Sequence, residues 1–387
     1  MKILLITSSF PNNDSIAGMF IPDTIRALNA RGVQVHVLTQ NCNDSRTISN
    51  SLWAGCDVTW FGWSGGNTPL VELIRRRIFG IFLVGQYLIN SFFAGRRICR
   101  NWRPDIIFAE WLIPAGFIAR ILSIFSGTPY VCRALGSDVY IAGANALIRP
   151  WIKRIAENSI LLFADGFDLC KKTSALASGK ECFFAATSRT PTNKKGSGGF
   201  RQKDDAGRFT FCCVGRLHPV KGQDVLIKAC AVLHKKEISF RCYLVGAGEE
   251  RGNLEKLIAS LSLEENVILT GRLEDGDVTE LIGNIDCLVI PSRSESIPLV
   301  LSEGISAKKP FIVSNVGDME YLAEKYNLGY VFSSENHDEL ACALIKISEA
   351  ELRTSFYNKE RYEELSSILS VKAGAKIIFD KINGLIN

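Results

Sequence analysis

Apolar positions in the first half of the chain follow two alternating patterns. A continuous apolar run occupies residues 2–10 (KILLITSSF), helical spacing follows over 20–32, and residues 33–39 (VQVHVLT) alternate between apolar and polar. Strand-like runs return at 105–111 and 129–135, with a helical pattern between them. Strands that alternate with helices are typical of a parallel sheet covered by helices on both faces. The first half is therefore predicted to be a doubly wound α/β domain.

The pattern is interrupted at 187–208, where Gly, Pro, Ser, Thr and charged residues replace apolar ones (TSRTPTNKKGSGGFRQKDDAGR). This composition is typical of a linker or surface loop. After it the alternation restarts, with strand patterns such as 209–217 (FTFCCVGRL) and 286–292 (DCLVIPS). A second Rossmann-like sheet follows from this repetition. We therefore expect three parts: domains over residues 1–187 and 188–365, and a C-terminal helix over 366–387 that packs back toward the first domain.

Length and composition agree with this division. The 387 residues suit two domains, and 47% hydrophobic against 22% charged residues is ordinary for a globular protein, which excludes a disordered or fibrous chain. The twelve cysteines show neither Cys-x-x-Cys pairs nor zinc-ligand spacing, so we expect reduced thiols. The N-terminal apolar run lacks the pattern of a signal peptide. A cytoplasmic protein is the expectation.

Charge is unevenly distributed along the chain. Residues 1–190 carry 20 lysines and arginines against 12 acidic residues, whereas the remainder carries 25 against 28. A basic half is compatible with nucleic acid, an anionic membrane surface or an acidic substrate. Because its arginines lie among apolar residues, without exposed aromatic and polar neighbours, a nucleic-acid partner is not expected.

The first stretch with chemical potential is VGRLHPVKG, after the first strand pattern of the second domain. Arg216 and Lys221 flank a short loop, and a glycine follows that opens a helix. Two cations beside a helix N-terminus suit a diphosphate, because the helix dipole and its free amides add to the positive charge. A solvated Arg and Lys beside an ordinary loop is the plainer alternative.

A glycine-rich turn follows the next strand pattern, in LVGAGEERG. Gly246 and Gly248 leave room for a nucleotide to approach the backbone. Alone this is weak support for a ligand site, since any strand-to-helix turn also favours glycine. Gly317, in SNVGDMEYL, has the same two interpretations.

The most specific stretch is PSRSESIPLVLSEGISAKKP. Glu295 precedes a predicted helix start at Ile297, Pro298 and Leu299, and Glu303 lies within that helix. At about 100° per residue, two carboxylates eight positions apart do not share a helix face, so different roles are expected. An ionised glutamate in an apolar helix needs a partner, and a ribose diol offers two donors.

Together these stretches resemble the retaining glycosyltransferases of family 4, which have the GT-B fold of two Rossmann-like doubly wound domains facing across a cleft. The resemblance spans nearly the whole chain. It includes SSFPNNDSIAGMF with Gly18, PAGFIA, GSDV, GRLHPVKG, LVGAGEE, DCLVIPS and the two glutamates separated by seven residues. Transferases of bacterial capsule, lipopolysaccharide and teichuronic-acid assembly look closest.

The resemblance implies a role for each matching position. Arg216 and Lys221 would bind the donor diphosphate, Glu303 the ribose hydroxyls, and Glu295 would lie near the transferred sugar. Gly18 would lie beside the donor phosphates, and Asp138 of the G-S-D triplet is a further catalytic candidate. The implied substrates are a nucleotide-sugar donor and a glycan or lipid-linked acceptor bound mainly by the first domain. No metal cofactor is implied.

Two departures from the family pattern affect these expectations. Leu135 stands where many members have a histidine, so an imidazole contact to the sugar is not expected. Lys308 replaces the usual glycine before the next strand, and a left-handed backbone there would cost about 1 kcal/mol relative to glycine. A catalytically inactive GT-B scaffold, or another nucleotide-sugar-binding GT-B enzyme, therefore stays open as an alternative.

A metal-dependent transferase is a further alternative. Asp275-Gly276-Asp277 has the letters of a D-x-D motif. However, LEDGDVTELI reads as a turn followed by a helix with Asp277 as its N-cap, which makes metal ligation the weaker interpretation.

The basic, apolar stretch at residues 75–97 is the last candidate. Residues 78–94 are mostly apolar and lie between two groups of arginines (Arg75, Arg76, Arg77 and Arg96, Arg97), but they reach only about 25 Å as a helix, short of a bilayer. Two buried helices broken near Gly85 are one interpretation. The other is a face that docks on the anionic inner surface of the cell membrane.

Overall fold

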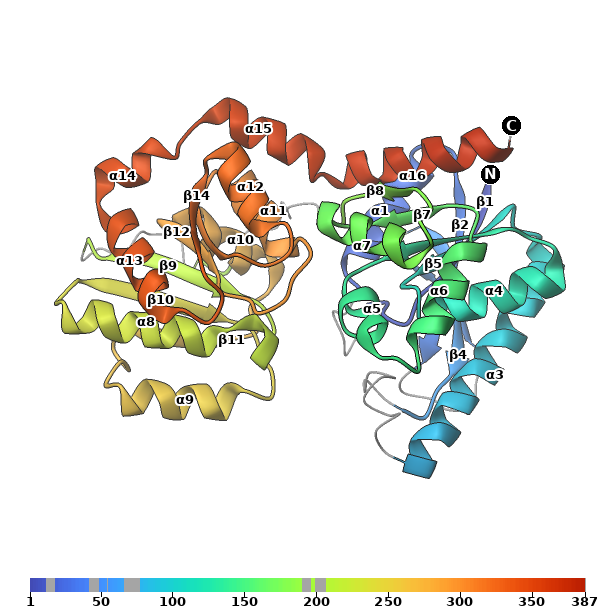
Figure 1. Cartoon of the computed structure of the whole chain (residues 1–387), viewed down its shortest axis with the longest axis horizontal. Coiled ribbons are helices and arrows are strands. Elements are labelled where there is room, and N and C mark those ends of the chain that lie inside the picture. The colour runs from blue at the N-terminus through green and yellow to red at the C-terminus, as the bar shows by residue number, and fades with distance from the viewer. Residues whose placement is uncertain are drawn as a thin grey trace. The chain divides into compact units, whose positions relative to one another are not determined.

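The computed structural model describes residues 1–11, 18–41, 49–53, 55–65, 77–189, 196–198 and 207–386. The chain forms two compact units (Figure 1). The first unit combines Met1–Ser188 with Val371–Asn387, and the second is Arg189–Ser370. The two units are described separately below.

The first unit is built on an eight-stranded sheet. Its order is β3-β4-β2-β1-β5-β6-β7-β8; β3 runs antiparallel to β4, and the other pairings are parallel. The strands are β1 (Lys2–Ile6), β2 (Gln34–Asn41), β3 (Ser49–Trp53), β4 (Cys56–Gly62), β5 (Ile106–Glu110), β6 (Tyr130–Ala134), β7 (Leu162–Ala164) and β8 (Cys182–Phe184).

Helices connect and cover these strands. They are α1 (Phe20–Asn29), α3 (Arg77–Trp102), α4 (Ala115–Ser126), α5 (Ser137–Tyr140), α6 (Arg149–Asn158), α7 (Phe167–Leu176) and α16 (Val371–Ile386). The α4 side chains Ile118 and Leu122 are buried in one core cluster with Leu4 and Ile6 of β1. The C-terminal α16 packs on α1 within this unit.

The second unit contains a six-stranded, wholly parallel sheet. Its order is β11-β10-β9-β12-β13-β14, and the order reverses between β9 and β12. The strands are β9 (Phe209–Val214), β10 (Phe240–Val245), β11 (Val267–Gly271), β12 (Cys287–Ile290), β13 (Phe311–Ser314) and β14 (Gly329–Phe332). This is the strand order of a dinucleotide-binding Rossmann fold.

The helices of the second unit follow the same alternation. They are α8 (Gln223–Lys235), α9 (Arg251–Ser260), α10 (Asp275–Asn284), α11 (Leu299–Ser306), α12 (Met319–Tyr326), α13 (His337–Ser348), α14 (Ala350–Ser355) and α15 (Lys359–Ile368), with a short 3-10 turn, η2, at Pro219–Lys221. The core packs β9 and β10 side chains such as Phe211 and Phe240 against α8 and α13.

The α/β fold expected from the sequence is confirmed, with differences at several ends. Strand β9 ends at Val214, two residues before Arg216. Helix α10 begins at Asp275 with Glu274 as its cap, so the prediction of Asp277 as N-cap was wrong; the first turn reaches further toward the N-terminus. Lys308 has the left-handed backbone whose cost was considered above, with φ 54° just after α11.

The structure of the apolar stretch before β5 contradicts one of the two interpretations given for it. Residues 77–102 form one continuous helix, so two helices broken near Gly85 are excluded. Over the described ranges, no helix combines the length and hydropathy that crossing a bilayer requires.

Candidate active site

The reversal of strand order in the second unit defines the candidate site. Strands β9 and β12 are direct neighbours there, and their following helices, α8 and α11, begin at the same carboxyl edge. In open parallel sheets, ligands bind in the crevice at this point. The first-turn amides of a helix lack intrahelical partners, so two such starts favour an anion.

The loops after β9 and β10 pack backbone against backbone. The Leu217 amide donates to the Ala247 carbonyl at 3.0 Å. A Cβ on Gly246 would lie 1.9 Å from the Gly215 oxygen, and one on Gly248 would lie 2.1 Å from the Leu217 oxygen. The structure therefore gives these two glycines a packing reason, apart from any nucleotide that approaches them.

Lys221 and Glu295 meet at the reversal point. The ammonium of Lys221 contacts the Glu295 carboxylate, which also accepts a hydrogen bond from the Ser292 hydroxyl at 3.1 Å. Ser292 is held in turn, because the Ser314 hydroxyl donates to its carbonyl at 2.5 Å. The side chains of Lys221 and Glu295 are 29% and 14% exposed. The pair is thus fixed by neighbours yet open to a ligand.

Arg216 lies on the same loop but in a different environment. Its guanidinium is 3.4 Å from Glu249, whose other carboxylate oxygen is 3.4 Å from the His218 ring. The Arg216 side chain is 55% exposed, so this ion pair holds it weakly. Arg216 is available to reorient toward an anion at the nearby helix starts.

Glu303 lies in α11 and has a protein partner that the sequence analysis missed. Arg189 is 3.6 Å from Glu303 and 2.6 Å from Asp275. Burial raises the pKa of the Glu303 carboxyl, and the charge of Arg189 lowers it in part. Arg189 falls in the polar stretch that was interpreted as a linker; the need of a buried glutamate for a cation was the available signal.

The start of α11 is largely buried. Pro298 caps the helix in extended conformation, Ile297 is buried before it, and Leu299 begins the helix. Gly317 packs behind this segment, since a Cβ there would lie 2.1 Å from the backbone carbonyl oxygen of Glu295. Only glycine allows this close approach to the backbone of Glu295, and the positive φ of 55° at Gly317 also favours glycine.

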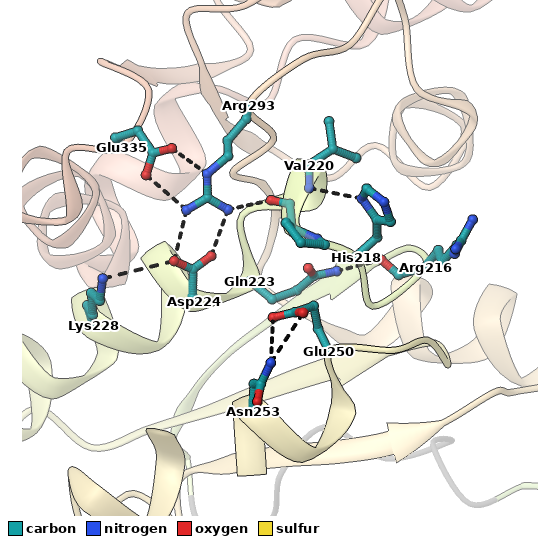
Figure 2. A network of polar contacts seen from close by, with 11 residues as sticks. Arg216, His218, Val220, Gln223, Asp224, Lys228, Glu250, Asn253, Arg293 and Glu335 are labelled. Carbon is teal, nitrogen blue, oxygen red and sulfur yellow. Dashed lines mark hydrogen bonds and ion pairs between the residues drawn. The ribbon is translucent and has the colours of Figure 1, made fainter. Parts of the chain in front are cut away.

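Arg293 ties several loops of this edge together (Figure 2). Its guanidinium donates two 2.8 Å hydrogen bonds to Asp224 and contacts Glu335 and the Pro219 carbonyl. Its amide donates to the Val220 carbonyl at 2.7 Å. Burial alone would raise the pKa of Asp224, but Arg293 lowers it below its usual value. The sequence analysis did not single out Arg293, which fixes the η2 turn.

Asp138 of the first unit is bound within its own unit. Its carboxylate accepts hydrogen bonds from the Leu112 amide at 2.8 Å and the Leu135 amide at 3.2 Å. Burial raises the pKa of Asp138 to about 6, although these backbone bonds lower it in part. The residue is buried and holds two loops in register, which does not favour the expected contact with substrate.

Gly18 likewise has a local reason to be glycine. Its φ is 75°, and an added Cβ would lie 2.1 Å from the Ser9 oxygen. Residues 12–17 of the same loop lie outside the described part of the chain, so the predicted contact with donor phosphates stays a prediction.

A buried ion pair occupies the carboxyl edge of the first sheet and was also missed. Glu110 of β5 faces Arg133 of β6, and the two side chains form hydrogen bonds of 2.9 and 2.5 Å with no exposure to solvent. The guanidinium also lies 5.6 Å from the Phe20 ring. The pair links neighbouring strands in the unit's interior.

The predicted site residues thus divide between the two units. The second unit brings Lys221 and Glu295 into contact, with Arg216 on the same loop and Glu303 in the adjoining helix; Gly18 and Asp138 belong to the first unit. The D-x-D aspartates are engaged otherwise: Asp275 binds Arg189, and Asp277 accepts from the Ser197 amide at 2.5 Å. Among the residues that the structure describes, no group of His, Cys, Asp or Glu is arranged to hold a metal ion.

Two family models match the chain, one within each unit. Residues 17–167 match the model described as "Glycosyl transferase 4-like domain", and residues 200–363 match "Glycosyl transferases group 1". An uncharacterised glycosyltransferase of Methanocaldococcus jannaschii is 23% identical over 99% of both chains. TuaC of Bacillus subtilis, whose name provisionally assigns it to teichuronic acid biosynthesis, is 22% identical over 98% of this chain and 97% of its own.

Solved structures show the same architecture. Sucrose-phosphate synthase from Thermosynechococcus elongatus has a TM-score of 0.79 at 16% identity, covering 99% of this chain and 98% of its own. HepE of Anabaena in complex with UDP-glucose has a TM-score of 0.73 at 17% identity, covering 99% and 100%. These likenesses show that the fold is GT-B.

The GT-B fold and the two family models define the class, which is that of the nucleotide-sugar-dependent glycosyltransferases. The chain belongs to the group 1 glycosyltransferases, family 4.

Proposed function

We propose that this protein transfers a hexosyl group, with retention of configuration, from a nucleotide-diphosphate sugar to a glycan or lipid-linked acceptor in bacterial surface polysaccharide biosynthesis. The contact between Lys221 and Glu295 at the strand-order reversal carries the proposal for the donor site. The likeness to TuaC supports the biosynthetic setting. HepE binds UDP-glucose, which makes this the first donor to test.

In this proposal Lys221 and Arg216 bind the donor diphosphate beside the N-termini of α8 and α11. As the bond between the anomeric carbon and the phosphate oxygen breaks, negative charge grows on the diphosphate, and these cations and amides stabilise it. The acceptor oxygen attacks the same face of the sugar. Its proton passes to the departing phosphate oxygen, so the step needs no protein base.

The carboxylates have separate proposed roles. Glu295 lies beside the transferred sugar and holds Lys221 in place through their contact. Glu303 accepts hydrogen bonds from the ribose hydroxyls, which share it with Arg189. Burial raises the pKa of Glu303, and the positive charge of Arg189 opposes this effect and so favours the ionised form.

The donor site is tested by calorimetric titration of UDP and UDP-glucose into purified protein. Lys221→Ala should weaken binding of both by about 10- to 100-fold, since losing a charge-assisted hydrogen bond costs about 1.5–3 kcal/mol. Lys228→Ala removes the same charge from α8, where Lys228 lies 3.9 Å from Asp224, and should leave binding unchanged. If both variants bind the two ligands as the parent does, the proposed site is wrong.

Transfer itself is measured by release of UDP with an added glycan acceptor, with and without excess EDTA. Activity should persist in EDTA, because cationic side chains replace a metal at the diphosphate. Loss of activity that manganese restores would instead point to Asp275 and Asp277. Binding of UDP-glucose with no release under any condition would favour the inactive scaffold.

A further inference from the structure

One face of α3 leaves large apolar side chains in solvent. Phe82, Ile89 and Phe93 are 69%, 57% and 62% exposed. Their spacing of seven and four residues places them on one side of the helix, and Arg96 and Arg100 continue that side by a further three and four residues. The helix therefore carries an exposed stripe that is apolar first and cationic toward its C-terminal end.

The stripe continues onto the end of α4, which lies beside α3 (Figure 1). Ile124 and Phe125 are both exposed there. The Phe125 ring is 5.3 Å from the Phe92 ring, and the Arg96 guanidinium lies 5.7 Å from it. We call this surface the α3–α4 face: Phe82, Ile89, Phe93, Ile124 and Phe125 with Arg96, Arg100 and Arg103.

An open cavity of about 640 Å³ lies in the cationic part of this face. Arg96, Arg100 and Arg103 line it together with Ser126 and Thr128, and its lining contains no acidic residue. Across the described ranges, no carboxylate forms an ion pair with any of the three arginines. Guanidinium groups suit phosphate oxygens, because they donate several hydrogen bonds and carry a positive charge.

The cavity lies at the opposite edge of the sheet from the buried charges of the first unit. It is formed where α3 and α4 end, before β5 and β6 begin, whereas Glu110 and Asp138 follow the carboxyl ends of these strands. Parallel sheets bind substrates at the carboxyl edge. The cavity is therefore separate from any substrate site of this unit.

We propose that the α3–α4 face docks on an anionic lipid bilayer, with its apolar side chains among the headgroups and lipid phosphates in the arginine-lined cavity. An apolar stripe beside cations is the composition of an interfacial helix, and each arginine near an anionic surface adds attraction. A second copy of the chain fits less well, because a two-fold contact would bring two groups of three arginines into one interface.

The sequence analysis expected docking at the apolar stretch that lies between Arg75, Arg76 and Arg77 and Arg96 and Arg97. Arg75 and Arg76 lie outside the described residues, and of Arg77 only the backbone at the start of α3 is described. The inference keeps Arg96 from that prediction and adds Arg100 and Arg103. The docking proposal does not depend on the transfer reaction. The vesicle-binding test can therefore fail while the donor-binding test succeeds, and the reverse.

The test is flotation of the full chain with phosphatidylcholine vesicles, with and without phosphatidylglycerol. Binding should require phosphatidylglycerol and weaken as salt increases, because the attraction acts within a Debye length. Replacing Arg96, Arg100 and Arg103 together by Gln should reduce partitioning about fivefold per arginine, on the order of 100-fold in total. Free phosphate added at the concentration of the lipid should not compete.

Two controls separate the face from net charge and from misfolding. Replacing the exposed Lys235, Lys236 and Lys256 of the second unit by Gln removes the same charge and should leave binding unchanged. Phe82→Ser with Phe93→Ser should weaken binding, whereas Leu52→Ser with Leu147→Ser, also at exposed sites, should not. Thermal unfolding confirms that each variant is folded.

Several outcomes would overturn the proposal. Equal binding to neutral and anionic vesicles would remove the role of charge, and equal losses in the arginine and lysine variants would remove the role of this face. Concentration-dependent dimers in sedimentation that the Phe82 and Phe93 substitutions abolish, without vesicle binding, would assign the face to a second copy.

Discussion

The carboxyl edges of the two sheets carry similar charged residues but use them differently. In the first unit, Glu110 and Arg133 bind each other in the interior, with no exposure. In the second unit, Lys221 and Glu295 also form a pair, yet both side chains remain in part exposed. Strand architecture and residue type are shared between the two edges, whereas burial is not.

This difference distinguishes structural charges from those available to a ligand. A fully buried pair is out of reach of a substrate, and removing one partner leaves an uncompensated charge. A partly exposed pair can be reached by a ligand, and solvent screening weakens the contact between its partners. The comparison predicts large effects on stability at the first edge and effects mainly on binding at the second.

The largest effect is expected from breaking the buried pair. Glu110→Gln leaves the Arg133 guanidinium charged in the interior and should reduce the free energy of unfolding by about 3–5 kcal/mol. Denaturant unfolding monitored by circular dichroism measures it. The double replacement of Glu110 and Arg133 by Met is the matched control and should recover much of the loss. A single variant within 1 kcal/mol of the parent would contradict the structural role.

A smaller effect is expected at Asp138. Asp138→Asn offers one acceptor oxygen to the Leu112 and Leu135 amides, so one buried amide loses its partner at a cost of about 1–3 kcal/mol. The folded pKa of Asp138, about 6, exceeds its usual value of 3.8, so its titration adds stability at low pH that is lost as the pH rises through 6.

The variant should therefore lack this part of the pH dependence. Unfolding free energies of parent and variant, measured from about pH 4 to pH 7, would give the difference between the two curves. Parallel curves would mean that Asp138 does not titrate as the buried geometry implies.

A gain in stability is expected after the C-terminal end of α11, the end opposite to the candidate site. Lys308 has a φ of 54° after α11, which is a left-handed conformation that glycine adopts without strain. Lys308→Gly should stabilise the protein by about 1 kcal/mol, since the left-handed cap no longer costs energy. Lys308→Ala keeps the Cβ and removes the charge, so it should give no gain. A shift in thermal unfolding temperature reports both.

The smallest effect on stability is expected at Arg216. Arg216→Gln removes an exposed pair with Glu249 and should change the unfolding free energy by less than about 1 kcal/mol. UDP binding should nevertheless weaken. A destabilisation as large as that of Glu110→Gln would remove the distinction between the two edges.

Much of this architecture was predictable from the periodicity of apolar residues and from the polar stretches that interrupt it. The alternation of strand and helix patterns, and the polar stretch after residue 187, indicated two α/β domains before any contact was known. Lys221 and Glu295 are 74 positions apart in the sequence, and placing both after strands at one edge predicted a shared site, although not the contact between them. Local pattern and general topology are sufficient for such residues.

Other features depend on contacts that the sequence pattern does not carry. Arg189 lies among linker-like residues, so its pairing with Glu303 required three dimensions. Glu110 is the last residue of β5, and Arg133 lies within β6. The burial of these two side chains depends on the register between the two strands. Gly246 and Gly248 were interpreted through a ligand, whereas the opposing loop supplies a sufficient cause.

The position of α16 has a consequence for how the chain is made. The first unit is closed by Val371–Ile386, which packs on α1 (Phe20–Asn29), so its earliest and latest parts meet only after the second unit has been synthesised. Until then the surface of α1 that α16 covers is bare, and nascent chains with bare apolar surface aggregate readily. Ribosome-bound chains arrested before residue 371 should therefore engage chaperones that the released protein does not.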